Sequence, residues 1–414
     1  MRIVCVGGGP AALYFAISAK RRDAGHEITV LEKDPRGATY GWGVVCHDAL
    51  LDRLYRNDRE SARAIRARSH LWQEQEVHLR DEEVGYLPGY GFSVPRAGLL
   101  EVLANRATDL GVDVRYESPV PETALADGTF DTGELAADLV VVADGARSRL
   151  RDHVADDYGT RLRTGRNPYI WLGTRKVFSC FTFAFEETHA GWVWCYGYPT
   201  SAGVSTFIVE CSPETFAGLG LDTLPHEDGI EMLQKIFAHT LDVQALISSS
   251  RGRPSPWLRF LEVRNETWRH ANTVLLGDAV HTTHYTMGQG TRFAMMDAVM
   301  LAQALQEQPS LSAALGTFDR KGREALRTAQ AAARTGSAWF ENVDRYLDRD
   351  AVEFAYALSY RSGMQPPWRY QWHIATQITP VRKGRRLVHT GRRWWRARKR
   401  GEQPFVPRGL LHAG

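Results

Sequence analysis

The chain has 414 residues, of which 43% are hydrophobic and 24% charged, and its formal net charge at pH 7 is +3. This composition indicates a globular protein larger than one average domain, which can bury its own core without disulfides or metals. No apolar run approaches the roughly 18 residues that cross a bilayer. The strand-like start carries no signal peptide, so we expect a cytoplasmic protein with no membrane partner.

Two further features of the composition exclude other classes. The cysteines are Cys5, Cys46, Cys180, Cys195 and Cys211. Their number is odd and no two have C-x-x-C spacing, so we expect neither a disulfide framework nor a metal site. The charge is uneven, because ten Lys or Arg residues and no acid lie between Arg382 and Arg400. Subtracting these ten from +3 leaves about −7 for the remainder of the chain.

The first predicted elements form a strand, a glycine-rich turn and a helix. Residues 2–6 read as a buried strand and residues 13–20 as a helix, with Gly7-Gly8-Gly9-Pro10-Ala11-Ala12 between them. This is the G-x-G-x-x-A form of the dinucleotide fingerprint. Gly7 would make the tight turn, Gly9 would admit a pyrophosphate together with Pro10 and Ala11, and Ala12 would keep the helix close to the strand. A second strand over 27–31 ends at Glu32, which is expected to hold a ribose hydroxyl, with Lys33 beside it.

Two later strands end in acidic motifs. Residues 137–142 form an apolar run that leads into Asp144-Gly145. Residues 273–276 form another that leads into Gly277-Asp278. The chain then passes His281, His284, Tyr285, Gly288, Gly290 and Thr291 before a helix predicted over 293–302.

The three motifs together resemble those of single-component flavoprotein aromatic hydroxylases, the p-hydroxybenzoate hydroxylase class. The resemblance implies that Asp278 contacts the FAD ribityl and pyrophosphate region. It also implies that Gly288, Gly290 and Thr291 bring a helix start to the flavin ring, where the helix dipole favours negative charge. Asp144 would contact FAD and the nicotinamide, and Arg96 would reach the FAD phosphates unless it is a solvated arginine at a helix start. The implied cofactors are FAD, NADH or NADPH as a transient reductant, and molecular oxygen, which reacts as a flavin hydroperoxide.

Gly41-Trp42-Gly43-Val44-Val45 is similar to a stretch of salicylyl-CoA and aminobenzoyl-CoA hydroxylases and of the tryptophan hydroxylase of violacein biosynthesis. Residues 167–174, 205–211 and 339–347 share this likeness, which covers roughly 1–363. Gly43 and Val44 would lie beside the flavin ring and Trp42 beside the substrate. Many members of the wider class carry a proline near the position of His284. The implied substrate is an aryl acyl thioester similar to salicylyl-CoA. The alternatives are hydroxylation of tryptophan or another indole, free or bound to a carrier or peptide, a flavoprotein reductase or oxidase, and a non-enzymatic FAD module.

Candidate residues for proton transfer and substrate contact lie near these motifs. His47, His281, His284 and Tyr285 could orient the substrate or move a proton, because histidine titrates near neutral pH. Residues 181–185 and 192–196 alternate with period two and predict strands with one aromatic face. Phe183, Trp194 and Tyr196 on this face are expected to line a substrate cavity, unless they are core residues.

The expected fold is α/β, with a Rossmann-like FAD-binding domain of the glutathione reductase type, an inserted β-sheet substrate domain and a C-terminal helical region. The predicted FAD-binding domain comprises residues 1–75, 96–170 and 265–320, and the substrate domain 76–95 and 171–264. C-terminal helices are expected over 321–363, followed by a basic extension over 364–414. The extension is either a solvated, partly helical tail or a docking surface for an acidic or phosphate-bearing partner such as a CoA thioester, a carrier protein or an acidic peptide. Nucleic acid is not an expected partner, and the protein is expected to be a monomer or a homodimer.

Overall fold

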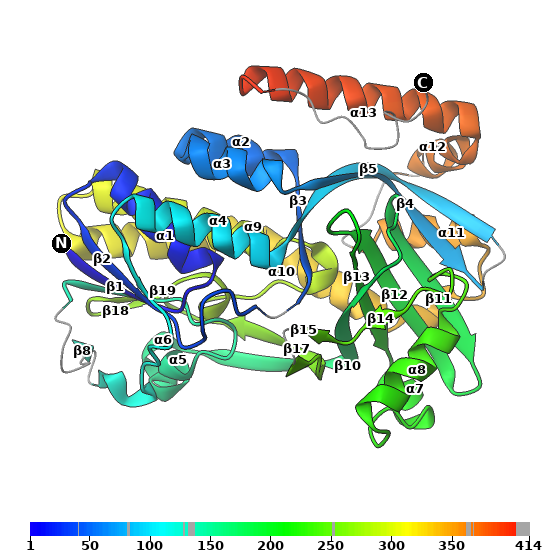
Figure 1. The fold of residues 1–414 in the computed structure, drawn as a ribbon, viewed down its shortest axis with the longest axis horizontal. Helices are drawn as coiled ribbons and strands as arrows, with labels where there is room; N and C mark the ends of the chain where they lie inside the picture. Colours follow the sequence, from blue (N-terminus) through cyan, green and yellow to red (C-terminus); the bar gives the residue numbers. More distant parts are fainter. Residues whose placement is uncertain are drawn as a thin grey trace.

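The structure is a computed structural model that describes residues 1–39, 41–80, 83–126, 129–130, 137–250, 253–361, 366 and 368–402. Figure 1 shows two sheets beside each other, with helices packed against both, and a helical pair across the top. This arrangement confirms the predicted α/β fold, with a nucleotide-binding sheet, a second sheet and C-terminal helices.

The first sheet has six strands in the order β18-β19-β9-β1-β2-β6. Its strands are β1 (Arg2–Val6), β2 (Glu27–Leu31), β6 (Asp113–Arg115), β9 (Leu139–Val142), β18 (Arg269–His270) and β19 (Thr273–Leu275). All neighbouring strands are parallel except β18 and β19. β9 is buried throughout and β1 almost so, which is typical of parallel strands covered on both faces.

Four helices build the core of this unit. They are α1 (Pro10–Arg22), α4 (Arg96–Asp109), α9 (Gly290–Glu307) and α10 (Leu311–Phe340). α1 contacts both α4 and α9, and α9 contacts α10. α1 buries ten consecutive residues from Pro10 to Ala19, because it lies between the sheet and these neighbouring helices. The shorter helices α5 (Arg149–His153) and α6 (Ala155–Tyr158) follow β9.

The second sheet has nine strands in the order β14-β10-β13-β12-β11-β4-β5-β3, with β17 also paired to β10. The strands are β3 (Gly43–Cys46), β4 (His70–Leu79), β5 (Glu83–Pro95), β10 (Arg161–Thr174), β11 (Phe181–Thr188), β12 (Gly191–Pro199), β13 (Ser205–Cys211), β14 (Leu246–Ile247) and β17 (Trp257–Arg264). Its pairs are antiparallel except β4 with β11. One face packs against α8 (His226–Ile236), and the other faces the cavity described below.

Further helices pack against both units. α2 (Asp48–Asn57) and α3 (Arg59–Ala67) follow β3, and α11 (Ala351–Ser359), α12 (Trp368–Gln377) and α13 (Thr379–Lys399) end the described chain. α13 lies across β5 and above α2 in Figure 1. The predicted basic extension is therefore helical over most of 368–399 and is packed against the protein. Residues 364–365, 367 and 403–414 of that extension lie outside the described part.

The remaining elements are short. They are α7 (Pro213–Gly218), the strand pairs β7 (Leu125–Ala126) with β8 (Thr129–Phe130) and β15 (Ser249–Ser250) with β16 (Arg253–Pro254), and 3₁₀ helices at Glu122–Ala124, Gly277–Ala279, Tyr285–Met287 and Val343–Tyr346. Within the described residues, no helix combines the length and the apolar character that a membrane span requires. The division of the chain into domains stays a prediction. The boundary predicted at residue 75 falls inside β4, and β3 and most of β10 pair in the second sheet although both were assigned to the FAD-binding domain.

Candidate functional site

The three motifs singled out in the sequence lie side by side in space. β1, β9 and β19 are parallel neighbours, so the turns after them meet at one edge of the sheet. The chain order reverses here, because β2 follows on one side of β1 and β9 on the other. Ligands of α/β proteins bind at such a switch point. Gly7 has a φ of +100°, and a Cβ on it would lie 2.5 Å from the carbonyl oxygen of Ala143, so the close approach of these turns requires glycine.

A cavity of about 800 Å³ opens at this edge. The predicted cofactor residues that line it are Gly7, Gly9, Pro10, Ala11, Glu32, Lys33, Arg96, Asp144, Asp278 and Thr291. Ala12 is absent from the lining because it is fully buried in α1, where a small side chain lets the helix pack closely. α1 starts at Pro10 with no side-chain cap and no acid in its first turn, so its N-terminal N–H groups are available to an anion.

Several charged groups of this cavity lack the partners that such groups normally have. The Nε of Arg96 and the Oδ1 of Asp144 are enclosed and make no hydrogen bond among the described residues. Burial lowers the pKa of Arg96, and burial raises the pKa of Asp144 and of Asp278. Asp278 is open to the cavity and enclosed by protein on its other sides. These unmatched groups fit FAD, because its phosphates would pair with Arg96 and its hydroxyl groups would donate to the two carboxylates.

Glu32 is held in place by the turn that it faces. Its Oε2 accepts a hydrogen bond of 2.6 Å from the amide of Gly8, and its Oε1 accepts one of 2.9 Å from the amide of Asp34. A carboxylate can accept about four hydrogen bonds. Glu32 therefore retains capacity for a ribose hydroxyl while its position is set by the backbone.

A second cavity of about 400 Å³ continues from the first, and both are lined by Arg96, Ala146, Arg147, Asp278 and Thr291. Four further predicted cofactor residues line it, namely Gly43, Val44, Gly288 and Gly290. α9 begins at Gly290 without a side-chain cap, so its N-terminus faces the place where the two cavities join. A helix N-terminus at this point would stabilise the negative charge of a reduced flavin ring.

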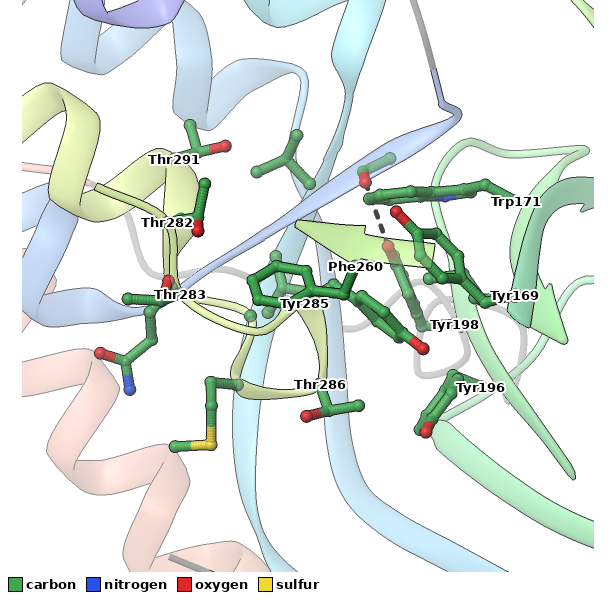
Figure 2. Close-up of a pocket in the computed structure, with 18 of the residues that line it drawn as sticks. Tyr169, Trp171, Tyr196, Tyr198, Phe260, Thr282, Thr283, Tyr285, Thr286 and Thr291 are labelled. Atoms are coloured by element: carbon green, nitrogen blue, oxygen red, sulfur yellow. Dashed lines mark hydrogen bonds between the residues drawn. The ribbon is translucent and has the colours of Figure 1, made fainter. Parts of the chain in front are cut away.

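The far end of the second cavity is aromatic. Figure 2 shows the rings of Tyr169, Trp171, Tyr196 and Tyr198 on one side and Thr282, Thr283 and Thr291 on the other. The aromatic wall follows from strand periodicity, because β10 contributes Tyr169 and Trp171 while β12 contributes Tyr196 and Tyr198 at alternate positions. The Tyr198 hydroxyl donates to the carbonyl of Gly43 at 3.0 Å and so ties this wall to β3.

A buried carboxylate organises the tyrosines of this wall. Glu210 of β13 is 1% exposed, and its Oε2 accepts hydrogen bonds of 2.6 Å from the hydroxyls of both Tyr196 and Tyr285. Its Oε1 accepts from the Nδ2 of Asn167 at 2.8 Å. Burial raises the pKa of Glu210, although these hydrogen bonds oppose the shift. Since the Tyr285 hydroxyl donates to Glu210, its oxygen remains an acceptor toward the cavity, whereas the Tyr196 oxygen already accepts from Trp194 Nε1.

The structure divides the four predicted catalytic residues into two pairs. His47 and Tyr285 line the second cavity. His281 does not line it, because the ring is buried and its Nε2 bonds to Asp297 Oδ2 at 2.8 Å. His284 lines a separate cavity of about 50 Å³, and burial lowers its pKa to about 3. Its ring stacks on Tyr285 with centroids 4.4 Å apart, so His284 supports Tyr285 as a neutral group.

Two of the four predicted substrate residues also lie away from the cavity wall. Phe183 and Tyr196 line the second cavity, whereas Trp42 and Trp194 do not. Trp194 projects from the same face of β12 as Tyr196 but lies between Phe185 and Phe340, and its Nε1 donates to the Tyr196 hydroxyl at 3.0 Å. Trp42 packs against Gly173, where a Cβ would lie 2.8 Å from the indole. Both tryptophans therefore support the cavity from behind.

Sequence reasoning missed several residues of the site. They are Trp72, Gln75, Tyr169, Trp171, Phe181, Tyr198, Phe260, Arg361 and the supporting Glu210. Three of these residues could have been found from the sequence. Tyr169 and Trp171 have the period-two spacing that marked the other strands, and Glu210 is an isolated acid in an apolar strand. Arg361 could not have been found from the sequence, because no local pattern places residue 361 against a cavity built from residues 43–291.

Comparison with known proteins identifies the family of this chain. The family model described as FAD binding domain matches residues 1–335. A salicyloyl-CoA 5-hydroxylase of Streptomyces sp is 35% identical over 92% of this chain and 70% of its own length. A 3-hydroxy-4-methyl-anthranilyl aryl-carrier protein 5-monooxygenase of Streptosporangium sibiricum is 37% identical over 92% of this chain and 100% of its own. The protodeoxyviolaceinate monooxygenase of Chromobacterium violaceum is 29% identical over 89% of this chain and 96% of its own.

The fold is also found in solved structures. 2-Methyl-3-hydroxypyridine-5-carboxylic acid oxygenase superposes with a TM-score of 0.67 at 21% identity, covering 87% of this chain and 95% of that one. The chain belongs to the FAD binding domain family and, within it, to the flavoprotein aromatic hydroxylases, monooxygenases that use FAD, a reduced nicotinamide nucleotide and molecular oxygen.

Proposed function

We propose that this enzyme hydroxylates an aromatic ring that is presented as an acyl thioester. The observation that carries the proposal is the aromatic cavity, which continues from the FAD cradle and ends in two tyrosines held by Glu210. Two relatives at 35% and 37% identity are named for a CoA-bound and a carrier-bound aryl substrate. The second candidate is an indole, favoured by the more distant violacein-pathway relative and by a wall of flat rings that an indole would also fill.

Residues of the first cavity would hold the cofactor. The α1 N-terminus and Arg96 would bind the FAD phosphates, and Glu32 would bind a ribose hydroxyl. Asp144 and Asp278 would accept hydrogen bonds from other hydroxyl groups of FAD. When bound, FAD supplies the chemistry, since reduced flavin activates molecular oxygen for insertion into an electron-rich ring.

The residues of this chain orient the substrate ring, exclude water from it and transfer its proton. Tyr169, Trp171 and Phe260 provide flat apolar surface that excludes water from the reacting ring. The oxygen of Tyr285 can accept a hydrogen bond from a ring hydroxyl or amine while its own hydrogen goes to Glu210 Oε2. Glu210 then takes the proton, because its raised pKa makes it a better base than an exposed carboxylate.

A panel of substrates tests this function. The purified enzyme with FAD, NADH or NADPH and ¹⁸O₂ would be given matched hydroxyaryl compounds as free acids, as CoA thioesters and as carrier-bound thioesters, with tryptophan alongside. We expect ¹⁸O in the thioester products and a lower KM for thioesters than for the acids. Nicotinamide oxidation that releases only hydrogen peroxide for every compound would contradict a hydroxylase of this panel. Labelling of tryptophan alone would select the indole candidate.

We further propose that α13 carries the docking surface for the carrier, an acidic protein that bears the thioester. Some of its cations contact the protein, because Arg382 and Arg386 bond to Glu74 and Arg400, which follows the helix, bonds to Asp48. Apolar side chains point outward, and Leu387, Val388, Trp394 and Trp395 are exposed. Lys383, Arg392, Arg398 and Lys399 are exposed around them. Exposed tryptophans surrounded by cations are complementary to an acidic protein surface with an apolar centre.

The position of α13 links this surface to the substrate cavity. Glu74 sits at a β-bulge of β4, with a φ of +69°, and its neighbour Gln75 lines the second cavity. A carrier on α13 would thus lie close to the cavity wall. Deleting the helix would be a poor test, because it would uncover Tyr86 and Tyr90, on which Arg382 and Arg393 stack.

Charge reversal on the outward face is the sharper test. The triple change Arg392→Glu, Arg398→Glu and Lys399→Glu should raise the KM for a carrier-bound substrate at least tenfold and leave a small thioester unchanged. Arg320→Glu with Lys321→Glu on the exposed side of α10 is the matched control and should change neither. An equal effect on both substrates, or binding of the helix to anionic vesicles with no effect on the carrier, would refute the docking proposal.

A further inference from the structure

Arg361 is an arginine of the substrate cavity that the function described so far does not use. It follows α11 and lines the second cavity, with its guanidinium carbon 5.9 Å from the ring centroid of Phe183. Nη1 donates to the carbonyl of Leu358 at 2.9 Å, and Nη2 makes a long contact of 3.4 Å with the carbonyl of Thr286. Nε is enclosed and has no partner among the described residues. A guanidinium has five N–H donors, so more than half of its capacity is unused.

The charge of Arg361 is also unmatched. Among the described residues, no carboxylate lies within 4.0 Å of its nitrogens, although the second cavity encloses the side chain. This enclosure lowers the pKa of the guanidinium, and an interaction with Tyr196 opposes that shift. Enclosing a cation without a counter-charge is costly, and an arginine remains charged in proteins. The geometry therefore calls for an anion supplied from inside the cavity.

Arg361 lies at the tyrosine end of that cavity. Its Nη2 contacts the carbonyl of Thr286, the residue directly after Tyr285, and an interaction with Tyr196 opposes the lowering of its pKa. The Tyr285 oxygen is an acceptor at this end, because its own hydrogen goes to Glu210. One end of the cavity thus combines a route that accepts a proton with a cation that stabilises the resulting negative charge.

We propose that Arg361 forms a binding site for a phenolate, the deprotonated ring hydroxyl of a hydroxyaryl substrate. This inference rests on the proposed function, because a thioester has lost its carboxylate and the anion must then be carried by the ring. The hydroxyl proton passes to the Tyr285 oxygen while the Tyr285 proton passes to Glu210 Oε2. The phenolate oxygen then accepts hydrogen bonds from Nε and an Nη of Arg361. A phenolate ring is richer in electrons than a phenol ring, so the same contact activates the ring for hydroxylation.

Binding spectra of four ligands test the proposal. The ligands are a hydroxybenzoyl thioester, the benzoyl thioester without the hydroxyl, and the two corresponding free acids. Difference absorbance of the bound ring at several pH values reports whether the hydroxyl is ionised. In the wild-type holoenzyme the pKa of the bound hydroxyl should fall by about 1 to 3 relative to the free ligand, as for a group beside an opposite charge. In Arg361→Met it should return to the free value or above.

Two further variants separate this role from a structural one. Arg320→Met removes an exposed arginine of α10 that does not line the cavity and should behave as wild type. Arg361→Lys keeps the charge without the Nε–H, so it should give an intermediate pKa, and it decides the outcome if the Met variant does not fold. FAD content and thermal midpoint are measured for each variant. An unchanged bound pKa in Arg361→Lys and Arg361→Met, or an equal loss of affinity for ligands with and without the hydroxyl, would overturn the proposal.

The same ligands distinguish failure of this inference from failure of the proposed function. If the wild type binds the acids better than the thioesters, the thioester assignment fails, while an Arg361 effect confined to hydroxyl-bearing ligands still supports the phenolate site. If the Arg361 variants lose affinity for both acids whether or not the hydroxyl is present, Arg361 binds a carboxylate and the phenolate site is refuted.

Discussion

Replacing Glu210 separates its role in holding two tyrosines from its role in accepting a proton. Glu210→Gln keeps an oxygen that can accept from Tyr196 and Tyr285, and the new amide can donate to Asn167 Oδ1, which has no partner among the described residues. Glu210→Leu has a similar size but accepts nothing. Neither variant buries a charge, so the cost of burying the carboxylate cancels when the two are compared. In Glu210→Leu two tyrosine hydroxyls lose their acceptor, which costs about 1–3 kcal/mol each. The free energy of unfolding of Glu210→Leu should therefore be lower than that of Glu210→Gln by about 2–6 kcal/mol.

Urea unfolding of the holoenzyme measures this difference in stability. The pH dependence of that stability reports the ionisation of Glu210. Burial raises the pKa of Glu210, so the folded protein holds this proton to a higher pH than the unfolded chain. The wild type should therefore lose stability as the pH rises from about 4.5 through the folded pKa, and Glu210→Gln should lack this loss. Hydroxylation of a phenolic substrate should rise over the same range in the wild type and be low and flat in Glu210→Gln. Equal stability of the Gln and Leu variants, or a Gln variant with the wild-type pH profile, would refute this reasoning.

Three further changes have definite outcomes. Asp278→Ala should purify largely without FAD, measured as the flavin-to-protein absorbance ratio, and a fully flavinated variant would contradict the assignment. Burial lowers the pKa of His284 to about 3, so the unfolded chain takes up this proton first as the pH falls below about 6.5. Between pH 7 and pH 5 the wild type should lose about 2 kcal/mol that His284→Asn retains, measured by urea unfolding at both pH values. Glu74→Gln should speed tryptic cleavage within 382–400, whereas Glu122→Gln, which alters an exposed ion pair, should not.

The nucleotide-binding half could be predicted because its signals are local. Gly7 is required by a backbone approach within one strand-turn-helix unit, and Glu32 lies at the end of the next strand. The meeting of Asp144 and Asp278 also follows from sequence, because both end apolar strands that a parallel sheet must align. Each of these inferences needs only the period of an element and its neighbours.

The substrate half required distances that periodicity does not contain. Alternation placed Trp194 and Tyr196 on one face of β12, and the structure agrees, yet the cavity ends between them. His281 and His284 are three residues apart in an irregular segment, where no period says which side chain faces the flavin. In the structure, one bonds to Asp297 inside α9 and the other supports Tyr285. The residue types identified the candidates, but the sequence did not indicate the direction in which each side chain points.

α13 shows how a charge pattern can be identified correctly and its orientation still be missed. Ten cations without an acid left two interpretations open, a solvated, partly helical tail or a docking surface, and in both the cations were expected to be exposed, because lysine and arginine are rarely buried. Arg382, Arg393 and Arg400 depart from that rule, because β5 offers the rings of Tyr86 and Tyr90 and Asp48 offers a carboxylate. Arginine suits such a surface, since its flat guanidinium can stack and pair at once. With Arg382 and Arg393 directed toward β5, Trp394 and Trp395 lie on the outer face of the helix and are exposed. Such an arrangement leaves an apolar surface in water, which a stable protein tolerates more readily when a partner covers it.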